Sequence, residues 1–305
     1  MKARLRGTEM SSVDHGNGTI WPAVVMVFSF AWYELAYHSA AAPRSIGVYL
    51  LLYSVIVLGG AAVFGRGWVR RADGFGVLFT TLSAIAPFFV DEERRLRVRW
   101  PLAGVSTLPQ TTAFVSFVIV VLGSTTFDGF TRSSFWFDLA GDEVGWGRTT
   151  FNTFGMVAVT LLVGLAYVLA INVMASMVDE PAEALTVAFG PSLVPIAAAY
   201  AVAHYFSFLV LEGQRMFIHI SDPFGRGWDL FGTVDYEINW QFVSSQTIAW
   251  VQTLGIALGH VFGVAVAHDR AVSRYPHQLA VRSQYPMLVV MVLYTLAGLF
   301  LLLGK

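Results

Sequence analysis

The chain has 305 residues, of which 56% are hydrophobic and only 13% are charged, and its mean hydropathy is +0.62. Soluble domains are normally about one quarter charged, so this composition indicates a polytopic membrane protein. The net charge of −1 and the lack of a basic cluster interleaved with aromatic residues exclude a nucleic-acid-binding surface. Cysteine is absent, which excludes disulfides, thiolate metal sites, iron–sulfur clusters and cysteine nucleophiles.

Apolar runs follow a polar segment of residues 1–19 and recur to the end of the chain. A membrane span needs roughly 20 apolar residues. We expect seven membrane helices in a single transmembrane domain of residues 20–305: Ile20–Tyr37, Ile46–Phe64, Thr111–Thr126, Phe154–Val178, Ala184–Leu211, Ser245–Ala267 and Pro286–Leu303. The first run lacks the cleavage pattern of a signal peptide, so we predict that it is a span and not a cleaved leader.

An eighth apolar run, Phe75–Val90, is shorter and contains Pro87. Charged residues flank it on both sides, so we expect an interfacial or re-entrant segment, followed by an amphiphilic surface segment at Asp91–Trp100. The predicted fold class is therefore all-α: an integral membrane helical bundle of about seven transmembrane helices plus this short segment.

Basic residues predict the orientation, because cytoplasmic loops carry an excess of Lys and Arg. With seven spans and the N-terminus inside, 13 of the 19 basic residues fall on the inner side and six on the outer side. We therefore expect a multi-pass protein of the cell membrane with a cytoplasmic N-terminus. Its outer loops are then residues 127–153 and 212–244.

Two histidines lie inside predicted spans that are joined by the second outer loop. His204 is in the fifth span and His260 in the sixth, and ionisable side chains in hydrocarbon are functional candidates. If the two helices are antiparallel neighbours, the imidazoles can face each other. His268 follows His260 by eight residues, about 12 Å along a helix, which is too far to share one ion. A metal ion would therefore take His204 with one of the other two, and Asp269 lies beside His268 as a further candidate ligand.

Carboxylates at the same predicted depth extend this candidate site. Glu34 in the first span and Glu212 at the end of the fifth both lie toward the outer side, and such groups tend to face a bundle interior or a wet cavity. We predict that Glu34, His204, Glu212 and His260 form one polar cluster that opens outward. Asp128, at the outer mouth of the third span, is a further candidate.

The alternative is a purely structural role, in which each histidine makes an interhelical hydrogen bond, as polar side chains in membranes commonly do. Two histidines and two carboxylates on three helices favour a functional site. The chain has no HxxxH or HExxH spacing that would mark a dedicated metal site.

The loop SDPFGRGWDLFGTVDY contains Asp222 and Asp229 among glycines and aromatic residues. It is either a lid whose acidic groups attract cations to the outward mouth of the site, or a compact structural cap at the interface. Its glycines permit tight backbone paths in both cases.

Several stretches together resemble a family of actinobacterial multipass membrane proteins whose members are commonly labelled fenitrothion hydrolase. The similar stretches are FAWYELAY, AVFGRGWVRRADGFGVLF, GSTTFDGF, VAHYFSFLVLEGQ, SDPFGRGWDLFGT, GHVFGVAVAHDRAV and RSQYPMLVVMVLYT. The resemblance covers the chain from about Ala31 onward and is most specific at residues 222–233. Family members carry additional membrane segments before the part that corresponds to Ala31.

What the resemblance implies is hydrolysis of an organophosphate triester, a hydrophobic small molecule, by a membrane-bound enzyme. A divalent metal ion held by His204, His260 and Glu34 or Glu212 would then activate water. An alternative is a non-enzymatic membrane component that binds haem, through His204 and His260, or copper. Two further alternatives are a transporter that uses the same His/Glu cluster, and a structural subunit with a partner in the lipid bilayer.

Overall fold

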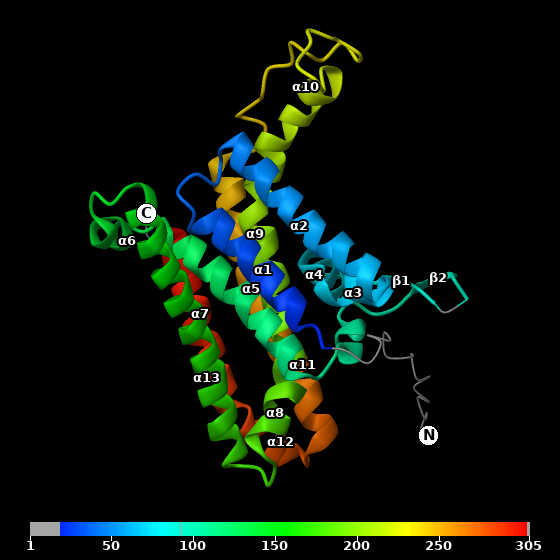
Figure 1. Ribbon diagram of the computed structural model, residues 1–305. Helices are drawn as coiled ribbons and strands as arrows, with labels where there is room; N and C mark the ends of the chain where they lie inside the picture. Colours follow the sequence, from blue (N-terminus) through cyan, green and yellow to red (C-terminus); the bar gives the residue numbers. More distant parts are fainter. Residues whose placement is uncertain (1–18, 92, 304–305) are drawn as a thin grey trace.

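Long antiparallel helices dominate the computed structural model, which describes residues 19–303 apart from residue 92 (Figure 1). Within these described residues, six helical runs are long and apolar enough to cross a membrane, so the chain is a helical multi-pass membrane protein. Four of them are single helices: α2 (Pro43–Phe64), α5 (Thr112–Thr131), α7 (Gly145–Ala175) and α11 (Ser245–Arg274). The fifth run joins α8 (Ala182–Phe189), η2 (Gly190–Leu193), α9 (Val194–Leu211), η3 (Glu212–Gln214) and α10 (Arg215–Ser221). The sixth consists of α12 (His277–Ser283) and α13 (Tyr285–Leu303).

The first predicted span forms a shorter helix, α1 (Trp21–Leu35). Its 15 residues extend about 22 Å, less than the roughly 30 Å of a bilayer core. The predicted count of seven full spans is therefore not confirmed. Nevertheless α1 packs inside the bundle, where Ala23 and Ala31 are buried against its neighbours.

Residues 66–83 fold into two short helices, α3 (Arg66–Ala72) and α4 (Gly74–Ser83). The Trp68 indole donates to the Ile56 carbonyl oxygen, and the Tyr53 hydroxyl donates to Asp73 at 2.6 Å, so α3 runs back along α2. Asp73 then caps α4 by accepting from the Phe75 N–H. With 10 residues, α4 is about 15 Å long, half the thickness of a bilayer core.

The second half of the predicted re-entrant segment is not helical. β1 (Phe88–Val90) pairs antiparallel with β2 (Leu96–Val98), and the short helix η1 (Ala103–Thr107) follows. This small hairpin, which is closed by ion pairs from Arg95 and Arg97 to Asp91, does not change the all-α class of the fold. The hydrogen bond from Arg97, followed by those from Arg95, lowers the pKa of Asp91 to about 2.

Helices also occupy parts of the two predicted outer loops. In the first, α5 continues to Thr131, α6 (Ser134–Ala140) follows, and α7 begins at Gly145. Ser133 caps α6, and the Trp136 ring packs edge-on against Phe127 at 5.3 Å in a small hydrophobic cluster. Local capping and aromatic burial therefore turn this segment into helix. In the second loop, α10 continues the line of α9.

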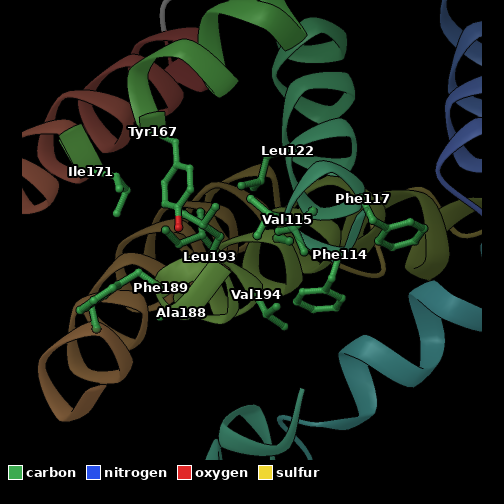
Figure 2. Close-up of a cluster of buried hydrophobic side chains, with 14 of the residues drawn as sticks. Phe114, Val115, Phe117, Leu122, Tyr167, Ile171, Ala188, Phe189, Leu193 and Val194 are labelled. Carbon is green, nitrogen blue, oxygen red and sulfur yellow. The ribbon is translucent and has the colours of Figure 1, made fainter. Parts of the chain in front are cut away.

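The main core lies where α5, α7, α8 and α9 meet (Figure 2). Phe114 and Phe117 of α5 and Phe189 of α8 are almost completely buried there. The Tyr167 hydroxyl of α7 donates to the Thr186 carbonyl oxygen at 2.7 Å, which gives the buried phenol a partner.

Close contacts between glycines and neighbouring helices set the crossings of the bundle. A Cβ on Gly259 of α11 would lie 2.2 Å from the Cβ of Ala199 in α9, and one on Gly123 of α5 would lie 2.6 Å from the Thr160 Cα in α7. Small residues let membrane helices approach this closely. They therefore fix the register between the helices that carry the polar residues described below.

We predict that Gly123→Ala destabilises the protein by about 1–3 kcal/mol, because its methyl group meets backbone that cannot move aside. Gly59→Ala in α2 is the matched control, since a Cβ there meets nothing within 4 Å. Thermal unfolding in detergent should show a lower midpoint for Gly123→Ala and an unchanged or higher one for Gly59→Ala. Equal midpoints for the two variants would contradict this account of the α5–α7 contact.

Candidate functional site: an Asp–His pair between two cavities

A carboxylate and an imidazole meet between α5 and α9. Asp128 Oδ2 lies 3.0 Å from His204 Nδ1, and the Asp128 carboxylate also lies 3.2 Å from the guanidinium of Arg132, one turn later in α5. The side chains of Asp128 and His204 are 14% and 25% exposed, whereas that of Arg132 is 54% exposed. Tyr205 packs edge-on against the His204 ring at 4.5 Å. The pair is thus sheltered, and both Asp128 and His204 have partners, as such groups require in an apolar setting.

On one side of the pair lies a cavity of about 340 Å³ between α5, α9, α11 and α13, which we call the polar cavity. Its lining includes hydroxyl, amide and guanidinium groups as well as apolar side chains. The polar groups that line it besides the pair are those of Thr125, Thr126, Arg132, Tyr200, Ser207, Ser245 and Gln252. Groups of this kind can bind water or the polar part of a ligand.

On the other side lies a cavity of about 350 Å³ between α1, α4, α5 and α9, which we call the apolar cavity. Most of its lining residues are apolar, and Phe30, Phe75, Leu78 and Phe79 are among them. Only a few polar groups face it. These are Glu34, Ser124, Thr125, Asp128, His204 and Tyr205, so the Asp–His pair borders both cavities.

Glu34 and His204 both line the apolar cavity. Within residues 19–303, no ion pair or hydrogen bond engages the Glu34 side chain. Unlike the Asp128 carboxylate, the Glu34 carboxylate is therefore free to pair with a ligand.

His260 is placed elsewhere. The residue is only 5% exposed, its Nδ1 lies 2.8 Å from the Ile256 carbonyl oxygen of the same helix, and its Nε2 has no hydrogen-bond partner among the described residues. The rings of Tyr294 and Tyr200 lie 5.7 and 6.3 Å away. His260 is therefore a buried histidine among aromatic rings, and it lines neither cavity.

The register between α9 and α11 separates the two histidines. The Gln252 amide donates to the Ala203 carbonyl oxygen at 3.0 Å, so His204 lies level with the first turns of α11. His260 is eight residues beyond Gln252, which corresponds to about 12 Å along the axis. The helices are antiparallel neighbours, but the structure does not bring the imidazoles together.

The remaining metal candidates lie toward the opposite end of α11. His268 Nδ1 contacts the Gln284 amide at 3.2 Å, and Asp269 lines a separate cavity near Arg270. Glu212 forms an ion pair with Arg215 and lines neither of the two cavities beside the Asp–His pair. Among the residues that the structure describes, no three His, Asp or Glu side chains form a group that could hold a metal ion.

Asp222 and Asp229 build the loop that follows α10. Asp222 accepts from the N–H groups of Arg226 and Gly227 at 2.8 and 2.7 Å, and these bonds lower its pKa. Asp229 accepts from the Ser221 hydroxyl and the Val234 N–H, which lower its pKa in the same way. The loop projects from the bundle beyond α10 (Figure 1). These contacts favour the structural cap over the lid.

Sequence analysis missed Arg132, Tyr205 and Gln252 as neighbours of the site. The spacing of Asp128 and Arg132 is the signal that could have identified one of them, because residues four apart lie on one helix face. The other two depend on helix rotation, which the sequence pattern does not determine.

Comparison of the chain with protein-family models, with curated proteins and with solved structures finds no match.

We predict that Asp229→Asn loosens the loop, since an amide accepts the two hydrogen bonds less strongly than a carboxylate. Hydrogen exchange of residues 230–234 should accelerate, while Asp235→Asn leaves it unchanged. A lowered pKa in the folded state means that the stabilisation is present above the ordinary value of 3.8 and is lost as the pH falls below it. Protection that is insensitive to Asp229→Asn would show that this carboxylate does not hold the loop.

Proposed function

We propose that this multi-pass membrane protein hydrolyses an apolar ester at the Asp128–His204 pair, with His204 as the general base. The observation that carries the proposal is the 3.0 Å contact of the pair at the boundary of a polar and an apolar cavity. A base oriented by a carboxylate, with access to water and to an apolar compartment, is what such a reaction needs. The resemblance to membrane proteins labelled fenitrothion hydrolase agrees in naming an organophosphate triester.

In the proposed reaction, Asp128 holds His204 through Nδ1, so that Nε2 can take a proton. Water from the polar cavity gives that proton to Nε2 as its oxygen bonds to the phosphorus atom. The bond from phosphorus to the leaving oxygen then breaks, and the proton passes from Nε2 to that oxygen. Arg132, which lines the polar cavity, is placed to stabilise negative charge that develops on the phosphoryl oxygen.

Metal or haem chemistry is a poorer fit to the described donors. A divalent ion held by His204 and His260, or haem ligated by both, needs their nitrogens within a few ångströms, whereas the register offsets them by about 12 Å. His204 Nδ1 is also engaged by Asp128. The proposed reaction therefore uses no metal ion. Metal analysis and a visible spectrum of the purified protein test this point.

Transport is a second candidate, because Thr125, Asp128 and His204 border both cavities. A titratable pair between two compartments is an arrangement that proton-coupled transporters use. Uptake of protons or of an apolar solute into proteoliposomes, without hydrolysis, would favour this function.

The test of hydrolysis uses a nitrophenyl phosphotriester in detergent micelles, with release of nitrophenolate as the readout. We predict that His204→Ala and Asp128→Asn each lower the rate by about 10²–10⁴-fold, the usual contribution of general acid–base catalysis. His277→Ala, an exposed histidine of α12, is the matched control and should keep the wild-type rate. Absence of turnover in the wild type, or turnover that is unaffected by both variants, would reject the hydrolase.

We further propose that α1 makes a seventh crossing of a cell membrane and that its N-terminal end faces the cytoplasm, because 13 of the 19 basic residues then lie inside. Since the chain has no cysteine, single cysteines report the sidedness cleanly. In intact cells, a membrane-impermeant maleimide should label Gln241→Cys, before α11, and not Ser273→Cys, near its other end. The reverse pattern would invert the topology.

A further inference from the structure

The apolar cavity combines features that select one class of ligand. Its volume of about 350 Å³ lies within the roughly 300–1,000 Å³ of small-molecule sites. Most of its lining is aliphatic or aromatic, so an apolar occupant gains from leaving water or the aqueous interface. Phe79 and Tyr205, which line it, are 64% and 44% exposed, so the cavity reaches the lateral surface of the bundle.

The charged groups that face this cavity are unevenly balanced. Glu34 and Asp128 both line it, and no Lys or Arg is among its described lining residues. Asp128 is already paired with His204 and Arg132, whereas Glu34 has no ion pair within residues 19–303. A carboxylate beside an apolar cavity is stabilised by an opposite charge that arrives with the ligand.

The aromatic rings of the lining also favour a cation as the ligand. Phe30, Phe75, Phe79 and Tyr205 line the cavity with Glu34, and the rings of Phe30 and Phe75 contact each other at 4.7 Å. The negative face of an aromatic ring attracts a cation, and this attraction strengthens when the cation is desolvated.

We propose that the cavity between α1, α4, α5 and α9 binds lipophilic cations, with Glu34 as the counter-charge and the aromatic rings as the apolar wall. This goes beyond the proposed hydrolysis and does not rest on it, because binding is measured without turnover. A neutral apolar solute would use the same walls but would gain nothing from Glu34.

The experiment compares tetraphenylphosphonium with tetraphenylborate, two ions of nearly equal size and shape and of opposite charge. Equilibrium dialysis with the purified full-length chain in a neutral detergent gives the dissociation constant of each. We expect the cation to bind at least about tenfold more tightly than the anion, and Glu34→Gln to remove at least that factor for the cation. Glu34→Asp, which keeps the charge, should retain most of the preference.

Two further variants separate the site from general effects of charge and folding. Glu212→Gln removes a carboxylate of the same end of the bundle that is paired with Arg215 and lies outside the cavity, so cation binding should not change. Ala201→Phe fills the cavity without a change of charge and should weaken binding of both ions. Equal binding of the two ions by the wild type, or wild-type cation affinity in Glu34→Gln, would overturn the proposal. Hydrolysis can still be present in that event, so the two proposals fail separately.

Discussion

The cost of placing ionisable side chains in an apolar bundle governs this structure. Asp128 and His204 avoid that cost by meeting each other across the α5–α9 contact at 3.0 Å, and Arg132 adds a second partner to the carboxylate. Removing Asp128 would leave the sheltered His204 imidazole without its polar partner, so the pair ties the chemistry of the site to the packing of α5 against α9. Both cavities border this pair, and their linings differ in polarity, so the two sides of the pair face different environments.

Helix register decides which polar residues belong to the site. The α9–α11 crossing brings Gly259 against Ala199 and Gln252 against Ala203, and larger side chains there would force the helices apart or along one another. In this register Gln252 enters the polar cavity, whereas His260 lies two turns away among Tyr200 and Tyr294. Small residues with no chemistry of their own therefore determine the composition of the site.

Hydropathy and charge were enough to predict a helical membrane bundle. They could not predict that His204 pairs with Asp128 and not with His260, because axial register depends on the sizes of contacting side chains. The helix α6 and the β1–β2 hairpin were missed for another reason. Both depend on short-range contacts, the cap and buried ring around Ser133 and Trp136 and the ion pairs of Asp91, which a search for 20-residue apolar runs does not detect.

The pairing of Asp128 with His204 is the central claim, and nitrogen-15 NMR of the labelled imidazoles tests it most directly. The chain has seven histidines, and His204→Gln identifies the resonances of the one concerned. We predict that Asp128→Asn shifts the Nδ1 resonance of His204 strongly and leaves that of His260 in place, because His204 Nδ1 lies 3.0 Å from this carboxylate whereas His260 Nδ1 lies 2.8 Å from the Ile256 carbonyl oxygen. An unchanged His204 resonance in Asp128→Asn would show that the two side chains do not form a hydrogen-bonded unit, and the site proposed around them would have to be abandoned.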